Sequence, residues 1–358
     1  MPGQISRIPS LDGARALSVT LVILSHLQIL GGVPLLWRLE TDDFFAYGDY
    51  LDYGNLGVRV FFVISGFLIT SLMIGEHERA GSIALGRFYL RRALRIMPPY
   101  LAYLVVIMLL IPTGRVPARW SEIPAALAYF SDYYIPHGAL THTWSLSVEE
   151  QFYLLWPPLI LVLGLRRAHV GCVLVLIAAP IFRVLSDSGV WPTSAKFSFE
   201  SSADALAVGC LLALLRARLW QWERYRQMVS SRVPWLLPLC ALLLMGIPLP
   251  FVVRDVVAIP LLNIGVAILL DRHMRFPGSV GGRILNLAPL VWLGTLSYSL
   301  YLWQQLFAFT SYPLILRVTA ILVFAMASYY LLERPLLELR GRLRAAPVFQ
   351  DSAVGRLT

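Results

Sequence analysis

The segment 11–30 carries ionisable residues inside an apolar run long enough to cross a membrane. Arg15 and His26 are eleven positions apart, so at about 100° per residue they lie within about 20° of one helix face and roughly 16 Å apart. An imidazole can accept a proton and a guanidinium can bind an anion, which predicts a functional face. Asp12 is expected to cap the helix. The alternatives are that Arg15 reaches lipid phosphates and that His26 is a satisfied polar group between helices.

The stretch HTWSLSVEEQFYLLWP, residues 142–157, combines two adjacent glutamates with hydroxyl and aromatic side chains. Ser147, followed three positions later by Glu150, matches a capping box and predicts that a helix begins here. Glu149 would then lie in the first turn, near the outer membrane face. His26 is expected in the outer half of the membrane as well, and a carboxylate beside an imidazole can orient a general base.

Trp144 and Tyr153 belong to the same stretch. Tyr153 is one turn beyond Glu149 and can share its helix face. Both aromatic side chains are equally typical of the aromatic belt at a membrane surface. Their role therefore stays open between a functional site and a membrane interface.

Arginines gather in RFYLRRALRIMPPY, residues 87–100. On a helix, Arg91 and Arg95 lie on one ridge with Arg92 beside it. Guanidinium groups bind phosphate oxygens in a bidentate manner, so the three residues can form a phosphate clamp. The alternative is that they anchor a cytoplasmic loop, because such loops carry an excess of arginine.

The composition predicts the elements that position these residues. The chain has 358 residues, of which 58% are hydrophobic and 14% charged, with a mean hydropathy of +0.68. It is therefore expected to be an all-α polytopic membrane protein. Ten transmembrane helices are predicted, near residues 11–30, 56–75, 95–112, 148–164, 169–186, 203–217, 234–251, 255–270, 289–309 and 314–332. The segment 121–135, which Pro124 interrupts, is expected to be interfacial or re-entrant.

Most of the 30 Lys and Arg residues fall in segments that share one side of this predicted topology with the N-terminus. The N- and C-termini are therefore expected in the cytoplasm, and the protein in the cell (inner) membrane. Topology also explains the net charge of +9, so nucleic acid is not an expected partner. The three cysteines lie within predicted spans without a CxxC pattern, which predicts neither a disulfide nor a metal site.

Motifs along nearly the whole chain resemble those of the acyltransferase-3 family of integral membrane O-acyltransferases. In sequence order they are LDGARALSVTLVILSH, FFVISGFLIT, FYLRRALRIMPPY, WSLSVEEQFYLLWP, LSYSLYLWQ and ERP. The resemblance extends from residue 8 to about 340. It implies a single membrane domain over 8–340 and leaves 341–358 as a short cytoplasmic tail.

The resemblance implies catalytic roles for His26, Glu149 and Arg15, and acyl-CoA binding by Arg91, Arg92 and Arg95. The motif residues Trp144, Ser147, Glu150 and Tyr153 also match. One position departs from the family pattern: many relatives carry histidine where this chain has Gln304. Glutamine can only position a neighbour or form a hydrogen bond there.

The expected function is transfer of an acyl group, acetyl by resemblance, from acyl-CoA to a hydroxyl group. The expected acceptor is a glycan, a lipid-linked sugar or a small molecule, and membrane lipids surround the protein. Acyl-CoA is a donor substrate, and no permanently bound cofactor is expected. The alternatives are a transporter that uses His26 and Glu149 as a proton relay, and an accessory subunit that moves acyl groups across the membrane. No GxSxG, P-loop or HExxH motif occurs, and Ser65 is interpreted as a small packing residue.

Overall fold

The computed structural model describes residues 8–27, 53–134, 136–192, 197–245 and 250–338. Helices connected by short turns make up this part of the chain, and it contains no strand, which confirms the all-α prediction. The predicted tail 341–358 lies outside the described residues. The principal helices are α1 (Pro9–His26), α2 (Tyr53–Ala80), α3 (Leu85–Leu110), α4 (Ile123–Leu127), α5 (Thr143–Leu163), α6 (Ala168–Asp187), α7 (Phe199–Gln221), α8 (Glu223–Ser230), α9 (Leu236–Met245), α10 (Phe251–Val253), α11 (Ile259–Arg275), α12 (Val280–Leu285), α13 (Ala288–Thr295), α14 (Ser297–Ala308) and α15 (Leu314–Ser328).

Six of the described helical segments are long and apolar enough to cross a membrane, or seven if the bent pair formed by α8 and Val233–Met245 is one span. The chain is therefore a multi-pass membrane protein, but the predicted count of ten spans is not confirmed. Three of the ten predicted spans are not among these segments. They correspond to α1, to α7 and to the pair α13 and α14. Every residue from 201 to 210 in α7 is buried, and a helix surrounded by protein need not present an apolar surface to lipid. Leu296 separates α13 from α14.

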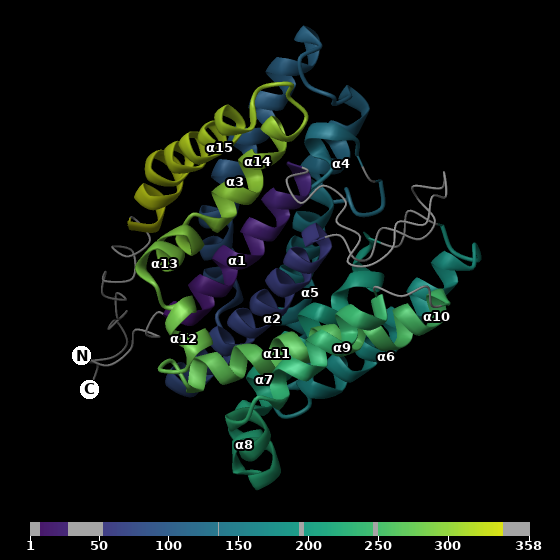
Figure 1. Ribbon diagram of the computed structural model, residues 1–358, viewed down its shortest axis with the longest axis vertical. Helices are drawn as coiled ribbons and strands as arrows, with labels where there is room; N and C mark the ends of the chain where they lie inside the picture. The colour runs from purple at the N-terminus through teal and green to yellow at the C-terminus, as the bar shows by residue number, and fades with distance from the viewer. Residues whose placement is uncertain (1–7, 28–52, 135, 193–196, 246–249, 339–358) are drawn as a thin grey trace, which may run out of the picture.

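Helix α1 runs through the middle of the bundle and packs against α2, α13 and α14 (Figure 1). The helix begins at Pro9, with Ile8 at its N-cap position. The prediction that Asp12 caps the helix is therefore wrong, because Asp12 lies inside the first turn. Helices α1 and α13 approach each other closely at Gly294. A Cβ atom at this position would lie 1.9 Å from the Asp12 carbonyl oxygen, so only glycine fits there.

Two glycines allow α2 and α7 to pack backbone against backbone. A Cβ atom on Gly66 would lie 2.0 Å from the Leu206 carbonyl oxygen, and one on Gly209 would lie 2.1 Å from the Val63 carbonyl oxygen. Small residues at such contacts let membrane helices approach closely. Ser65, the neighbour of Gly66, lies about 100° away around the helix and contacts Glu149 of α5.

Helix α1 defines the two ends of the bundle. The proximal end is where α1 begins, beside α12 and α13, and α8 projects from the same end; the distal end is where α1 stops at His26, on the side of α4 (Figure 1). The short helix α4 starts with Pro124 near its N-terminus and is far too short to span a membrane. The Tyr100 hydroxyl of α3 donates a hydrogen bond to the Ala126 carbonyl and holds α4 at the distal end.

Candidate active site

A cavity of about 310 Å³ lies between α1, α2, α3, α5 and α14. It follows α2 from Val58 to Leu72, a rise of about 21 Å at ~1.5 Å per residue. Helix α7 adds Arg216 to the wall. Most of the surface area of the wall is apolar. Its polar members among the described residues are Arg15, Arg92, Arg95, Arg216, Glu149, Glu150, Ser65, Ser71, Ser145, Ser297, Tyr153, Tyr298 and Tyr301.

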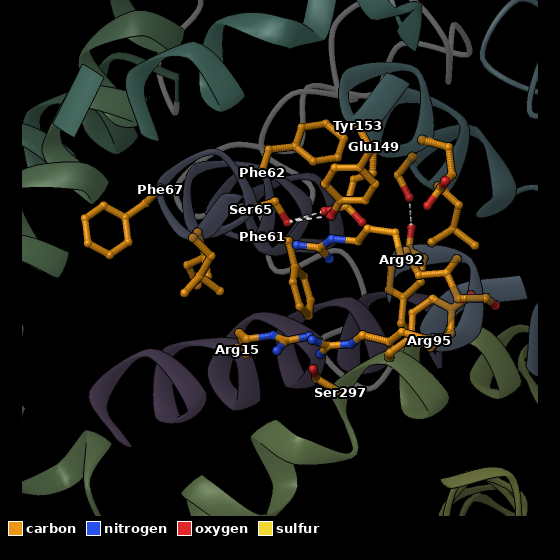
Figure 2. A pocket seen from close by; sticks show the side chains of 18 of the residues that line it. Arg15, Phe61, Phe62, Ser65, Phe67, Arg92, Arg95, Glu149, Tyr153 and Ser297 are labelled. Atoms are coloured by element: carbon orange, nitrogen blue, oxygen red, sulfur yellow. Dashed lines mark hydrogen bonds between the residues drawn. The ribbon is translucent and has the colours of Figure 1, made fainter. Parts of the chain in front are cut away.

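Arg15 and Arg95 extend toward each other across the cavity, with Ser297 close by (Figure 2). Their like charges repel, and Arg15 is also within electrostatic reach of Asp12 and Glu149. The buried Glu333 carboxylate, at the end of the π-helical turn Tyr329–Glu333 that follows α15, is hydrogen-bonded to Ser299 and attracts both arginines. Two guanidinium groups held side by side form a ready binding place for an anion.

The arginines of α3 do not all face the cavity. Arg92 lines the cavity and lies 4.5 Å from the centre of the Tyr153 ring, and Arg95, one turn further, lines the cavity as well. Arg91 is not among the lining residues and instead pairs with Glu76 of α2 at 3.1 Å. The structure therefore brings two of the three predicted phosphate-binding arginines to the cavity and turns the third toward α2.

Glu149 lies on the cavity among these arginines. Its Oε1 accepts a hydrogen bond of 2.5 Å from the Ser65 hydroxyl, which in turn accepts one of 3.4 Å from the Tyr153 hydroxyl (Figure 2). Among the positive charges that act on the Glu149 carboxylate, those of Arg15 and Arg92 have the largest effect. Tyr153 thus shares a face with Glu149, as predicted, and Ser65 joins the two side chains.

The helix that carries Glu149 begins earlier than predicted. Helix α5 starts at Thr143, so Glu149 lies about 9 Å along the helix rather than in its first turn. The predicted capping box is also wrong: the buried Ser147 hydroxyl donates to the Thr143 carbonyl at 3.0 Å and accepts from the Ser131 amide. Glu150 lines the cavity instead of capping the helix.

His26 lies at the distal end of α1, where its Nδ1 is 3.1 Å from Oε1 of Gln304 on α14. Arg15 reaches the same helix near Ser297 (Figure 2), which confirms that Arg15 and His26 share a face of α1. The structure thus places Glu149 with Arg15 on the cavity and places His26 with Gln304. Glu149 accepts a hydrogen bond from Ser65 and His26 pairs with Gln304, so the predicted partnership of Glu149 with His26 is not confirmed.

Tyr301 connects the cavity to the surroundings of His26. It lines the cavity, and it precedes Gln304 by one helical turn on α14. Its hydroxyl group is hydrogen-bonded to Ser145 and donates to the His142 carbonyl at 3.2 Å. The hydroxyl pair formed by Tyr301 and Ser145 therefore lies at the distal limit of the cavity, about one turn below Gln304.

Three of these residues, Ser65, Arg216 and Tyr301, are not predicted from the sequence as members of a site. Ser65 was interpreted as a packing residue, although the neighbouring Gly66 already indicated which side of α2 contacts a helix. Arg216 was treated only as part of the topology signal, and Tyr301 gave no separate signal. Trp144, which the sequence left between site and interface, packs edge-on against Phe62.

Comparisons with known proteins show which proteins the chain is similar to. YrhL of Bacillus subtilis (strain 168), named provisionally as a peptidoglycan O-acetyltransferase, is 30% identical over 379 residues, covering 92% of this chain and 55% of YrhL. The peptidoglycan O-acetyltransferase OatA of Listeria monocytogenes is 27% identical over 375 residues, covering 92% of this chain and 56% of OatA. The O-acetyltransferase OatA of Staphylococcus aureus (strain NCTC 8325 / PS 47) is 28% identical, covering 87% and 51%.

The chain thus spans a little over half the length of the curated relatives it matches. No solved structure gives a significant match to it. The profile of the family described as "Acyltransferase domain", Acyl_transf_3, matches residues 8–333, which is nearly all of the part that the motifs cover. The chain therefore belongs to the acyltransferase-3 family, as its motifs predicted.

Proposed function

We propose that this chain is a membrane O-acyltransferase that moves an acetyl group from acetyl-CoA to a hydroxyl group of a carbohydrate. The observation that carries the proposal is the shape and charge of the cavity. Four arginines and two glutamates line it, and the rest of its long wall is apolar or bears hydroxyl groups. An acyl-CoA has the complementary form: several phosphates, followed by a long, uncharged arm that ends in the thioester.

Arg15, Arg92, Arg95 and Arg216 bind the phosphates of the donor in this proposal. Each guanidinium offers several N–H groups in a planar fork that matches phosphate oxygens. Glu149, held by Ser65, keeps Arg15 and Arg92 in place and balances part of their charge before the donor arrives. The uncharged arm then extends along α2 toward Tyr301 and Ser145, at the distal limit of the cavity.

His26 acts as the general base at the other end of this path. It removes the proton from the acceptor hydroxyl as the oxygen attacks the thioester carbonyl. The C–S bond then breaks, the acetyl group stays on the acceptor oxygen, and protonated His26 gives its proton to the sulfur so that CoA leaves as the thiol. The names of the relatives support acetyl as the acyl group and a glycan such as peptidoglycan as the acceptor. In this account the proximal end faces the cytoplasm of the cell, where acyl-CoA is made, and both termini lie there.

The test is release of CoA from acetyl-CoA by the purified, detergent-solubilised protein, with and without soluble peptidoglycan fragments. We expect acceptor-dependent release by the wild type, loss in His26→Ala, and nearly normal release in Arg91→Gln, which changes an arginine off the cavity. A transporter consumes no thioester under any of these conditions. An accessory subunit consumes it only when a partner domain is added, so absence of release by the isolated wild type contradicts the proposal.

A further inference from the structure

Three amide groups form a continuous hydrogen-bonded series that ends at His26. The Gln305 Nε2 donates to the Gly138 carbonyl at 2.9 Å, and the Gln304 Nε2 donates to the Gln305 Oε1 at 3.0 Å. The Gln304 Oε1 then meets the His26 Nδ1 at 3.1 Å. Both glutamine side chains are buried, Gln304 completely and Gln305 to within 1%. Lipid and bulk water therefore cannot replace these bonds easily.

The Gly138 carbonyl at one end of this series determines which group donates and which accepts in every bond. A main-chain carbonyl only accepts, so Gln305 must present its NH₂ group to Gly138. Its oxygen is then left to accept from the NH₂ group of Gln304. The oxygen of Gln304 therefore faces His26, and Nδ1 of His26 must carry the hydrogen.

The anchor of the series is held rigidly. Gly138 has φ +59°, in the left-handed region, and a Cβ atom there would lie 2.0 Å from the Pro117 carbonyl oxygen. The same Pro117 carbonyl accepts a hydrogen bond from the Ala139 amide, and the Tyr103 hydroxyl donates to the Ala139 carbonyl. A residue with a side chain cannot occupy this turn without moving the backbone, so glycine sets the position of the carbonyl that orients both glutamines.

We propose that Gln304 and Gln305 hold neutral His26 in the tautomer with hydrogen on Nδ1, so that Nε2 is the atom that takes the acceptor's proton. Which imidazole nitrogen is protonated depends on the hydrogen bond that the other ring nitrogen makes. The two glutamines are positioning residues, and they act through His26 alone. The assignment of the tautomer stands on the hydrogen-bond series, and only the role of Nε2 rests on the proposed function.

The direct test is ¹⁵N NMR of the full chain, solubilised in detergent, with histidine as the only labelled residue type. His26 signals are assigned by their absence in His26→Asn. At a pH where His26 is neutral, the wild type should show a protonated Nδ1 and an unprotonated Nε2. The opposite tautomer in the wild type overturns the proposal.

Variants of matched size separate positioning from packing. Gln304→Met removes the acceptor at nearly constant volume and should give a mixture of tautomers, whereas Gln304→Glu keeps an acceptor oxygen and should restore hydrogen on Nδ1. Gln305→Met leaves Gln304 in place but frees its amide to rotate, so it should also give a mixture. An unchanged tautomer in both methionine variants contradicts the proposal. If Gln304→Met does not fold, Gln305→Met and Gln304→Glu decide the question.

Steady-state kinetics give a second, independent readout. We expect Gln304→Met to lower kcat by roughly 10–100-fold, within the contribution of a well-placed general base, with the KM for acetyl-CoA unchanged. Gln304→Glu should recover at least part of that loss. If NMR shows the Nδ1–H tautomer but no variant or wild type consumes thioester, the proposed function fails and the tautomer assignment stands. If transfer occurs and kcat does not follow the tautomer, the positioning role fails.

Discussion

The two ends of α1 place ionisable side chains in opposite kinds of surroundings. At the proximal end, Arg15 meets other charges: Arg95, Arg92 and Glu149 lie around one cavity. At the distal end, His26 meets the neutral amide of Gln304. A cluster of fixed charges is suited to holding an anion, whereas an uncharged amide partner leaves an imidazole able to exchange a proton. In the proposed function, this helix therefore serves donor binding at one end and proton transfer at the other.

The largest effect should come from the distal end. His26→Ala removes the general base, so kcat for acetyl transfer should fall by roughly 10²–10⁴-fold. The KM for acetyl-CoA should stay within a factor of about 3, because no contact of the arginine cluster is lost. Steady-state CoA release at varied donor concentration measures both constants. A decrease in kcat of less than tenfold removes His26 from the chemistry.

The proximal end should show the reverse pattern. Arg95→Gln deletes a charge-assisted bond to a donor phosphate, worth about 1.5–3 kcal/mol, so the KM for acetyl-CoA should rise by roughly 10–100-fold. Arg91→Gln is the matched control, since Arg91 lies four positions earlier on α3 and pairs with Glu76. Equal effects of the two variants show that general positive charge, rather than the cavity, is responsible.

A further arginine of the cavity, Arg216, is already paired with a carboxylate. Its Nε donates to the buried Asp271 at 2.6 Å, and its side chain remains 30% exposed at the cavity. Because solvent screens a partly exposed charge, Arg216→Gln should raise the KM for acetyl-CoA only about 3–10-fold. Arg218→Gln is the control on the same helix, where the side chain is exposed and off the cavity. Identical KM values for the two variants exclude Arg216 from donor binding.

The smallest expected effect concerns a loop at the distal end. Burial raises the pKa of Asp132 from 3.8 to about 6. The hydrogen bonds that its carboxylate accepts from Gln151 and the Phe199 amide lower the pKa, but by less than burial raises it. A pKa raised in the folded state stabilises the protein below the unfolded pKa and loses that contribution as pH rises through about 6. Asp132→Asn should therefore lose less thermal stability than the wild type between pH 5 and pH 7. Parallel melting curves over that range contradict this assignment.

The sequence predicted the all-α class and several of the residues that the structure brings to the cavity. Apolar runs predicted the helices, and the eleven-residue spacing placed Arg15 and His26 on one face of α1. The motif arginines led to Arg92 and Arg95. The predicted count of ten spans is not confirmed, and α7 is one helix that falls outside the six or seven candidates, because its buried half uses small and polar residues where a lipid-facing helix uses apolar ones.

Depth along a helix was not predictable from the motif alone. The pattern of Ser147 and Glu150 fits a capping box, but the same serine also bonds the carbonyl four residues earlier when it lies inside a helix. The error placed Glu149 in the first turn, more than a turn away from its position in α5. The role of Gln305 depends on a carbonyl 167 positions away, and no local pattern indicates such a contact.

The central claim is that donor binding and proton transfer occupy different ends of α1. The most direct measurement is equilibrium binding of acetyl-CoA by isothermal titration calorimetry to the solubilised wild type, His26→Ala and Arg95→Gln. The account predicts wild-type affinity for His26→Ala, despite its lost turnover, and a Kd roughly 10–100-fold higher for Arg95→Gln. Equal loss of affinity in both variants, or wild-type affinity in Arg95→Gln, contradicts it.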